Sequence, residues 1–325
     1  MDAIVEHSRD IIRKGSKSFA GATRLFDSDT RDSACMLYAW CRHADDEIDG
    51  QELGHAPSVA PVLPQTERLR ILRAKTLRAL EGEAEAGDPV FEALARVVAK
   101  HDIPPRHPLE LIHGFEMDVA GTDYVTLDDT CRYCYHVAGV VGVMMAMIMG
   151  VRSREALNRA SDLGIAFQLT NIARDVIDDA LHGRVYLPAE WLEDAGLARD
   201  GMAMTAAAIA DPSNRAAAFE ATERLLDEAE RYYVSARHGL PALPMRCAWA
   251  IATARCVYRD IGSVVRTRKA RAWDKRAVVS RARKVVSVAY AGLSISRAHL
   301  ADALGSAPPR ERLWTAPDLG IAGSS

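Results

Sequence analysis

The sequence predicts an all-α protein built from many antiparallel helices in a single domain. Alanine, leucine, arginine and glutamate dominate, and apolar residues recur with the 3.6-residue period of a helix along most of the chain. Segments of alternating polarity between turn residues, which would indicate strands, are scarce. At 325 residues, 49% hydrophobic and 26% charged, the chain is long enough for one large helical domain with an extensive core.

Helical periodicity is clearest in residues 66–85 and 215–240. Stretches rich in turn-forming residues interrupt it at 50–65, 101–108, 183–188 and 210–214. None of these breaks has the composition of a long interdomain linker, so we expect one domain over residues 1–304. Residues 305–325 are rich in Gly, Pro and Ser and are predicted to form a mobile tail.

The longest apolar run extends from Val137 to Val151 and is shorter than the roughly 20 residues that a helix needs to cross a bilayer. It predicts a helix that is apolar on all sides and buried inside the protein. Gly139, Gly142 and Gly150 leave space along it, either for a long apolar ligand or for close helix packing. On this run alone, close packing is the simpler explanation.

The net charge of −3 argues against a nucleic-acid-binding protein, because such proteins usually carry a strongly basic surface. The N-terminal residues are amphipathic and charged, unlike a secretory signal. Six cysteines lie in apolar, helix-like contexts, and reduced thiols in a cytoplasmic protein explain them most simply. Cys131 and Cys134 form a CxxC pair without a second pair at metal-site spacing, so we expect two small core residues.

Two acidic clusters indicate the chemistry. Asp45 and Asp49 lie four residues apart in a helical segment, and Asp175 and Asp179 repeat this spacing downstream. Residues at this spacing share one face of a helix, where like charges repel each other. We therefore expect a compensating cation on each face. Oxygen donors without His or Cys favour Mg²⁺ or Mn²⁺ over zinc.

Each acidic pair also has a basic residue beside it, Arg42 in the first cluster and Arg174 in the second, and Asn171 extends the second column by one turn. Protein-bound magnesium is usually held by one or two carboxylates together with substrate phosphates. A diphosphate is therefore the natural third component, with the arginines donating to phosphate oxygens. The alternative is a pair of chance helix-end acid clusters, which the repeated arrangement disfavours.

The motifs around these acids resemble those of the squalene/phytoene synthase family, most closely its bacterial phytoene synthase branch. They are RHADDEID (42–49), CYHVAGVVG (134–142), QLTNIARDVIDD (168–179) and GRVYLP (183–188). The resemblance extends from about residue 16 to residue 283. It implies an isoprenoid-synthase helical bundle in which two Asp-rich helices face each other across a central cavity. It also implies Mg²⁺-dependent, head-to-head condensation of two allylic diphosphates.

The resemblance further implies roles for individual residues. The positions that match metal ligands are Asp45, Asp49, Asn171, Asp175 and Asp179. The positions that match substrate contacts are Ser16, Lys17, Ser18, Arg42, Gln168, Asn171, Arg174, Arg184, Tyr258 and Arg276. Tyr133 matches a cavity tyrosine and joins the four aspartates in the catalytic set. Two positions depart from the family pattern, because Gly15 stands where many relatives have His, and His136 where some have Tyr.

By resemblance, the substrate is geranylgeranyl diphosphate, the intermediate prephytoene diphosphate and the product phytoene, a carotenoid precursor. An alternative within the family joins two farnesyl diphosphates to squalene, hydroxysqualene or dehydrosqualene, and the residues alone do not separate C15 from C20 substrates. A different class of function is that of a non-catalytic relative acting in assembly. The presence of all four aspartates disfavours that reading.

Phytoene is very apolar, so peripheral contact with a membrane would help its release. The basic stretch 266–284 is the candidate surface for this contact. We expect a cytoplasmic enzyme that binds prenyl diphosphates and no nucleic acid, and the sequence does not indicate an oligomeric state.

Overall fold

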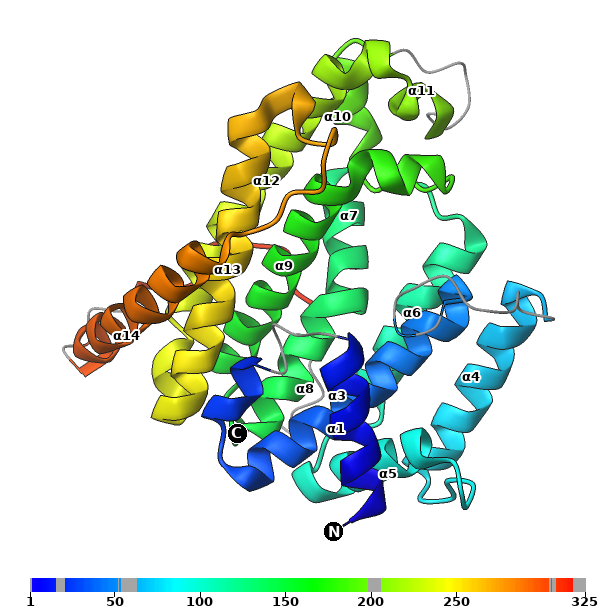
Figure 1. Cartoon of the computed structure of the whole chain (residues 1–325), viewed down its shortest axis with the longest axis vertical. Coiled ribbons are helices and arrows are strands. Elements are labelled where there is room, and N and C mark those ends of the chain that lie inside the picture. Colours follow the sequence, from blue (N-terminus) through cyan, green and yellow to red (C-terminus); the bar gives the residue numbers. More distant parts are fainter. Residues whose placement is uncertain are drawn as a thin grey trace.

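The computed structural model describes residues 2–15, 21–51, 53, 63–197, 206–303, 305 and 308–317. Within these ranges the chain forms helices joined by loops and contains no strand, which confirms the all-α prediction (Figure 1). The longer helices are α1 (Ala3–Gly15), α3 (Ser28–Asp49), α4 (Gln65–Leu80), α5 (Pro89–His101), α6 (Arg106–Ala120), α7 (Leu127–Cys134), α8 (Val140–Ile148), α9 (Arg154–Leu181), α12 (Arg215–Arg237), α13 (Met245–Arg268) and α14 (Arg281–Ala303). The shorter elements are η1 (Thr23–Leu25), the π-helical segment η2 (Tyr135–Gly139), α10 (Ala189–Asp194), α11 (Ala206–Ala210), η3 (Pro212–Asn214), η4 (Leu240–Ala242) and η5 (Lys269–Arg271).

Local sequence determines where the two acidic helices begin. α3 starts after Asp27, whose carboxylate accepts a hydrogen bond from the Thr30 amide at 2.9 Å. α9 starts after Ser153, whose hydroxyl oxygen accepts from the Ala156 amide at 3.3 Å. α3 ends at Gly50, which takes the left-handed conformation with φ 64°. These boundaries place both aspartate pairs in the last turns of long helices.

α9 lies at the centre of the bundle and packs against α7, α8, α12 and α13 (Figure 1). Two of its contacts need glycine, because a Cβ on Gly164 would lie 2.2 Å from the Ala138 carbonyl oxygen, and one on Gly142 would lie 2.5 Å from the Ala160 carbonyl oxygen. The glycine of the apolar run at position 142 therefore serves close packing of α8 against α9, as the simpler explanation predicted.

α7, η2 and α8 together form one helix from Leu127 to Ile148, which by length and composition alone could cross a membrane. The apolar run from 137 to 151 predicted a shorter helix, because the helix begins with more polar residues that lie before this run. In the structure 67% of the most apolar window is buried, as in the core helix of a soluble protein. Cys131 and Cys134 are free, buried thiols in this helix, which confirms their prediction as core residues.

Residues 308–317 lie against the core, which differs from the separate tail predicted for 305–325. The Arg310 guanidinium donates to both carboxylate oxygens of the fully buried Asp162, at 2.6 and 2.9 Å. The Trp314 amide donates to the Tyr232 hydroxyl at 3.1 Å, and Leu313 is buried. The physical reason is that an ionised carboxylate inside a core requires a cation, which composition does not reveal.

Because the Asp162 carboxylate is buried, replacing Arg310 would leave its charge without its main partner. We expect Arg310→Gln to lower the free energy of unfolding by about 2–4 kcal/mol. Chemical denaturation monitored by circular dichroism measures this change. Arg312→Gln, at an exposed position of the same segment, is the matched control and should change stability by less than about 0.5 kcal/mol. Equal stabilities of the two variants would contradict the assignment.

Candidate active site

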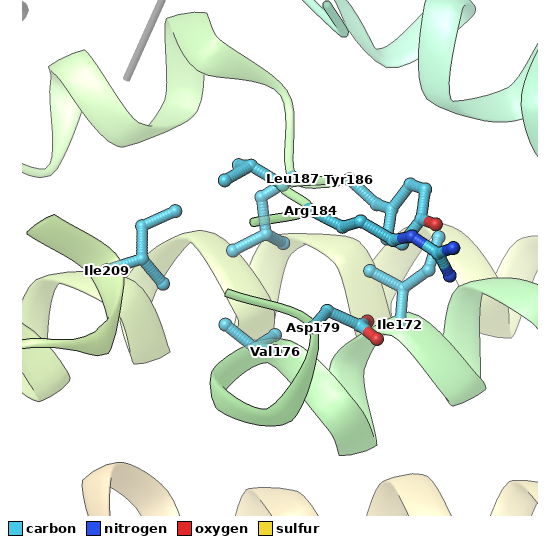
Figure 2. A pocket seen from close by; sticks show the side chains of 8 residues that line it. Ile172, Val176, Asp179, Arg184, Tyr186, Leu187 and Ile209 are labelled. Carbon is cyan, nitrogen blue, oxygen red and sulfur yellow. The ribbon is translucent and has the colours of Figure 1, made fainter. Parts of the chain in front are cut away.

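Arg184, in the loop that follows α9, joins the two aspartate pairs. It donates to the Asp49 carboxylate of α3 at 2.7 Å. Figure 2 shows Arg184 extending past Asp179, with both charged groups on the same side of a small pocket that is otherwise lined by apolar side chains such as Val176 and Leu187. The structure therefore brings together the two acidic clusters that the sequence places 126 residues apart, from 49 to 175.

The other predicted arginines each contact one of the acidic columns. Arg42 donates to the Asp45 carboxylate at 2.7 Å, and the Arg174 Nε donates to Asp175 Oδ1 at 2.8 Å. Arg276, which follows η5 in the chain, reaches the same Asp175 carboxylate at 3.4 Å. Each column is thus balanced by guanidinium groups of its own helix and of a following loop.

The carboxylates are nevertheless in an unfavourable electrostatic environment. Burial, followed by repulsion from Asp49, raises the pKa of Asp45 to about 6, although Arg42 opposes the shift. Burial, followed by repulsion from Asp175, raises the pKa of Asp179 to about 7. Both pairs also lie at the C-terminal ends of their helices, where the helix dipole disfavours negative charge. A cation with oxygen ligands would relieve all three effects.

The donor set fits a divalent cation that is completed by a ligand. Asn171 lies one turn before Asp175; its amide nitrogen donates to Gln168 at 3.3 Å, while its buried Oδ1 has no hydrogen-bond partner in the described part of the chain. Among the described residues, no cluster of three His, Cys, Asp or Glu side chains could hold a metal by itself. The protein alone therefore offers an incomplete coordination shell, which phosphate oxygens would complete.

A third helix, α6, contributes a further carboxylate, Asp118, which lies between the two columns and was not found from the sequence. Its negative charge raises the pKa of both Asp45 and Asp179, so it is close to each of them. Burial raises the pKa of Asp118 itself. An isolated acid on a helix gives no spacing pattern. The one feature that could have identified Asp118 is its position three residues after the buried Phe115, which places it on the apolar side of α6.

Asp118 is held by two tyrosines. It accepts hydrogen bonds from the Tyr133 hydroxyl at 3.0 Å and from the Tyr186 hydroxyl at 2.8 Å. The two rings stack with their centroids 4.6 Å apart, and Tyr124 packs edge-on against Tyr133 at 5.3 Å. Tyr133, predicted as a cavity residue, thus lies in an aromatic cluster beside the carboxylates. Tyr186 and Tyr124 were not among the predicted site residues.

Tyr258 of α13 lies near the arginines of both columns. Burial raises its pKa, while the positive charges of Arg174 and Arg42 oppose the increase. Its ring stacks on Phe167 at 4.1 Å between centroids. The sequence missed Tyr38, which lies one helical turn before Arg42 and close enough for the two side chains to interact, a spacing that could have identified it.

The predicted substrate contacts Ser16, Lys17 and Ser18 lie outside the described residues. The two departures from the family pattern have structural counterparts. A Cβ on Gly15 would lie 2.9 Å from the Tyr38 hydroxyl oxygen, so a larger residue there would require Tyr38 to move. The Nδ1 atom of His136 lies within hydrogen-bond distance of the Glu110 carboxylate of α6, at 2.8 Å, which indicates a role in joining η2 to α6.

Comparison with known proteins finds relatives among the squalene and phytoene synthases. The family model described as squalene/phytoene synthase matches residues 12–283. The chain is 53% identical over 295 residues to a phytoene synthase of Pseudescherichia vulneris, covering 91% of this chain and 93% of the relative. It is 47% identical to a 15-cis-phytoene synthase of Pantoea ananas, covering 97% and 98%. A dehydrosqualene synthase crystallised with a ligand has a TM-score of 0.77 at 29% identity, covering 90% and 97%.

The raised pKa values of Asp45 and Asp179 predict how stability depends on pH without divalent cations. An unfolded aspartate ionises near its ordinary pKa of 3.8, whereas the folded pKa values are about 6 and 7. The folded state therefore binds more protons between these values, and its stability should fall as pH rises from about 4 to about 7. Asp179→Asn should flatten this slope and raise the thermal midpoint at pH 8.

Thermal unfolding in the presence of a chelator measures this prediction. The exposed Asp178, adjacent in the chain, provides the matched control as Asp178→Asn, which should retain most of the wild-type slope, because Asp178 contributes less to the raised pKa of Asp179 than burial and Asp175 do. A slope that Asp179→Asn leaves unchanged would show that another group controls the pH dependence.

Proposed function

The chain belongs to the squalene/phytoene synthase family, and we propose that it joins two molecules of geranylgeranyl diphosphate head to head to form phytoene. Two diphosphates and two protons are released. The enzyme is a prenyltransferase of carotenoid biosynthesis with an all-α isoprenoid-synthase fold. The observation that carries the proposal is the meeting of two aspartate pairs with the arginines of α3, α9 and the following loops.

The guanidinium groups would bind the diphosphate of the substrate. A guanidinium has five N–H donors, and each of these arginines uses only some of them on aspartate. The Arg42 Nε is buried without a hydrogen-bond partner among the described residues, so it is a donor in need of an acceptor. Arg184 and Arg276 come from loops and can adjust to phosphate oxygens more easily than helical side chains.

We propose Mg²⁺ as the cation, with Mn²⁺ as a substitute, because the candidate donors are all oxygen atoms. The residues that would hold it are Asp45, Asp49, Asn171, Asp175 and Asp179. When bound, it would neutralise carboxylate charge and stabilise the departing diphosphate. The raised pKa values of Asp45 and Asp179 support this assignment, because burial and repulsion from neighbouring aspartates disfavour the ionised carboxylates, which a cation would stabilise.

The chemistry begins with loss of diphosphate from one substrate, which leaves an allylic cation. The C2–C3 double bond of the second substrate attacks this cation, and loss of one proton gives the cyclopropylcarbinyl intermediate, prephytoene diphosphate. Ionisation of the second diphosphate, rearrangement and loss of the second proton give phytoene. The protein must keep water away from these cations. The buried tyrosine cluster of Tyr124, Tyr133 and Tyr186 closes the site at α6 and α7.

The tyrosines of this cluster are poor candidates for the proton acceptor. Burial and the nearby Asp118 charge raise the pKa of Tyr133 and Tyr186 well above 10, so both hydroxyls stay protonated at neutral pH. Their role in this structure is to donate hydrogen bonds that orient Asp118. We propose that the released diphosphate accepts the proton.

A second candidate function uses farnesyl diphosphate and gives a C30 hydrocarbon. The solved dehydrosqualene synthase supports it through its shared fold, but at 29% identity. The relatives named phytoene synthase are 47–53% identical over nearly the whole chain and favour the C20 substrate. Their sequences therefore carry more weight than the likeness in fold.

The substrate is tested by incubating the purified protein with Mg²⁺ and either farnesyl or geranylgeranyl diphosphate, without NADPH. We expect a C40 hydrocarbon with a central conjugated triene from geranylgeranyl diphosphate, identified by chromatography and mass spectrometry. A C30 hydrocarbon as the main product would keep the chemistry and replace the substrate. Bound diphosphate without hydrocarbon from either substrate would favour the non-catalytic reading.

Removing one carboxylate tests the metal assignment. We expect Asp175→Asn to lower kcat by about 100-fold or more, because charge stabilisation at the leaving group is lost. The control is Asp178→Asn, three residues after Asp175 and exposed on α9, which should keep kcat within about threefold. Normal turnover of Asp175→Asn in saturating Mg²⁺ would refute the assignment.

A further inference from the structure

α14 exposes most of its large apolar side chains. It packs against α13 and η4 mainly through Ala291 and Ile295, which are buried. On the opposite side, Val286, Leu293 and Leu300 follow one another at seven-residue intervals and are 57%, 63% and 61% exposed. A surface helix normally turns such a stripe toward the core. The outer side of α14 is therefore an apolar surface without a partner in the described structure.

Further side chains extend this surface. Val285 and Tyr290 of α14 are exposed, and so is Trp249 of the adjacent α13. The indole N–H of Trp249 donates to the Val288 carbonyl oxygen at 2.9 Å, which holds its ring against α14. We call Val285, Val286, Tyr290, Leu293, Leu300 and Trp249 the α14 patch. Figure 1 shows α14 at the edge of the bundle with its far end projecting away from the other helices.

The charge around the patch is positive. Residues 266–299 contain ten Lys and Arg residues and one acidic residue, Asp274, in a chain whose net charge is −3. Several of the earlier cations are already paired within the protein, including Arg266 with Asp227 and Arg283 with Asp260. The exposed Arg281 and Arg297 lie one turn from patch residues on α14 itself.

We propose that the α14 patch docks this protein on an anionic lipid bilayer. Apolar side chains flanked by arginines, with Tyr and Trp among them, match the boundary between acyl chains and phosphate headgroups. The choice of a bilayer rests in part on the proposed function, because a C40 hydrocarbon product needs an apolar phase to enter. The docking surface differs from the 266–284 stretch predicted by composition, since much of that stretch is paired internally.

A second copy of the chain is a poorer occupant of the patch. Two α14 helices packed face to face would bring Arg281 and Arg297 of both copies together. Within the sequence of α14, the one acidic residue is Asp302, at the C-terminal end of the helix, against Arg281, Arg283, Lys284 and Arg297. Like charges across a symmetric interface disfavour association, whereas lipid phosphates attract the same arginines.

The experiment is co-sedimentation of the full chain with vesicles of phosphatidylcholine alone or mixed with phosphatidylglycerol, without substrate. The patch variant is Val286→Gln with Leu293→Gln, because Gln preserves helix propensity. Its matched control is Leu77→Gln with Val234→Gln, which removes exposed apolar side chains from α4 and α12. Circular dichroism and the thermal midpoint verify that all variants are folded.

We expect the wild-type chain and the control to bind the phosphatidylglycerol vesicles, and the patch variant to bind at least about tenfold more weakly. Arg281→Gln with Arg297→Gln should reduce binding to phosphatidylglycerol vesicles, and added salt should do the same. Equal binding of patch variant and wild type would overturn the proposal, as would the absence of wild-type binding to both vesicles. Loss of self-association in the patch variant, with vesicle binding unchanged, would assign the surface to a second copy instead.

Hydrocarbon formation is measured on the same preparations in detergent, which keeps the two proposals separate. A patch variant that still forms the C40 product but no longer sediments with vesicles supports docking independently of catalysis. A wild-type chain that binds vesicles but forms no hydrocarbon would refute the proposed function and leave the docking surface in place.

Discussion

Repulsion among buried carboxylates is the interaction around which this site is organised. Asp45, Asp118 and Asp179 come from three helices, α3, α6 and α9, and each has its pKa raised by burial. Such a group of acids is costly unless positive charge and hydrogen-bond donors surround it. The tyrosines on Asp118 and the arginines on the two columns supply part of this compensation. In the proposed function, a cation and a charged substrate would supply the rest of this compensation.

The sequence predicted the features that depend on local spacing. Acids four residues apart on helices of recognisable period identified the two columns and their arginines, and the structure places Arg184 between them. Features that depend on tertiary packing could not be predicted in this way. Asp118 stands alone on α6, and its meaning comes only from the two tyrosines and the columns that the fold brings to it. Composition likewise predicted that residues 305–325 form a separate tail, because composition cannot reveal the buried ion pair between Arg310 and Asp162.

α14 illustrates a second kind of information that the structure adds. Its sequence has the composition of an ordinary helix, and its charges alone suggested a broad basic surface. The packing shows which of its sides is occupied, and by which residues. Ala291 and Ile295 occupy the side toward α13 and η4, while Val286, Leu293 and Leu300 remain outside. The division between an inner and an outer side of this helix therefore comes from the fold and not from the residue types.

The ion pair between Asp162 and Arg310 also sets an order of events during synthesis. The two residues are 148 positions apart, and Asp162 lies on α9, the helix that carries the second aspartate column. While the ribosome is still adding the residues after 303, all the helices of the described structure have already been synthesised. Arg310 is not yet present to pair with Asp162. Until Arg310 is synthesised, the Asp162 carboxylate lacks the guanidinium partner that it has in the folded protein. Docking of residues 308–317 is therefore a late step of folding, which a chain that ends before residue 310 cannot complete.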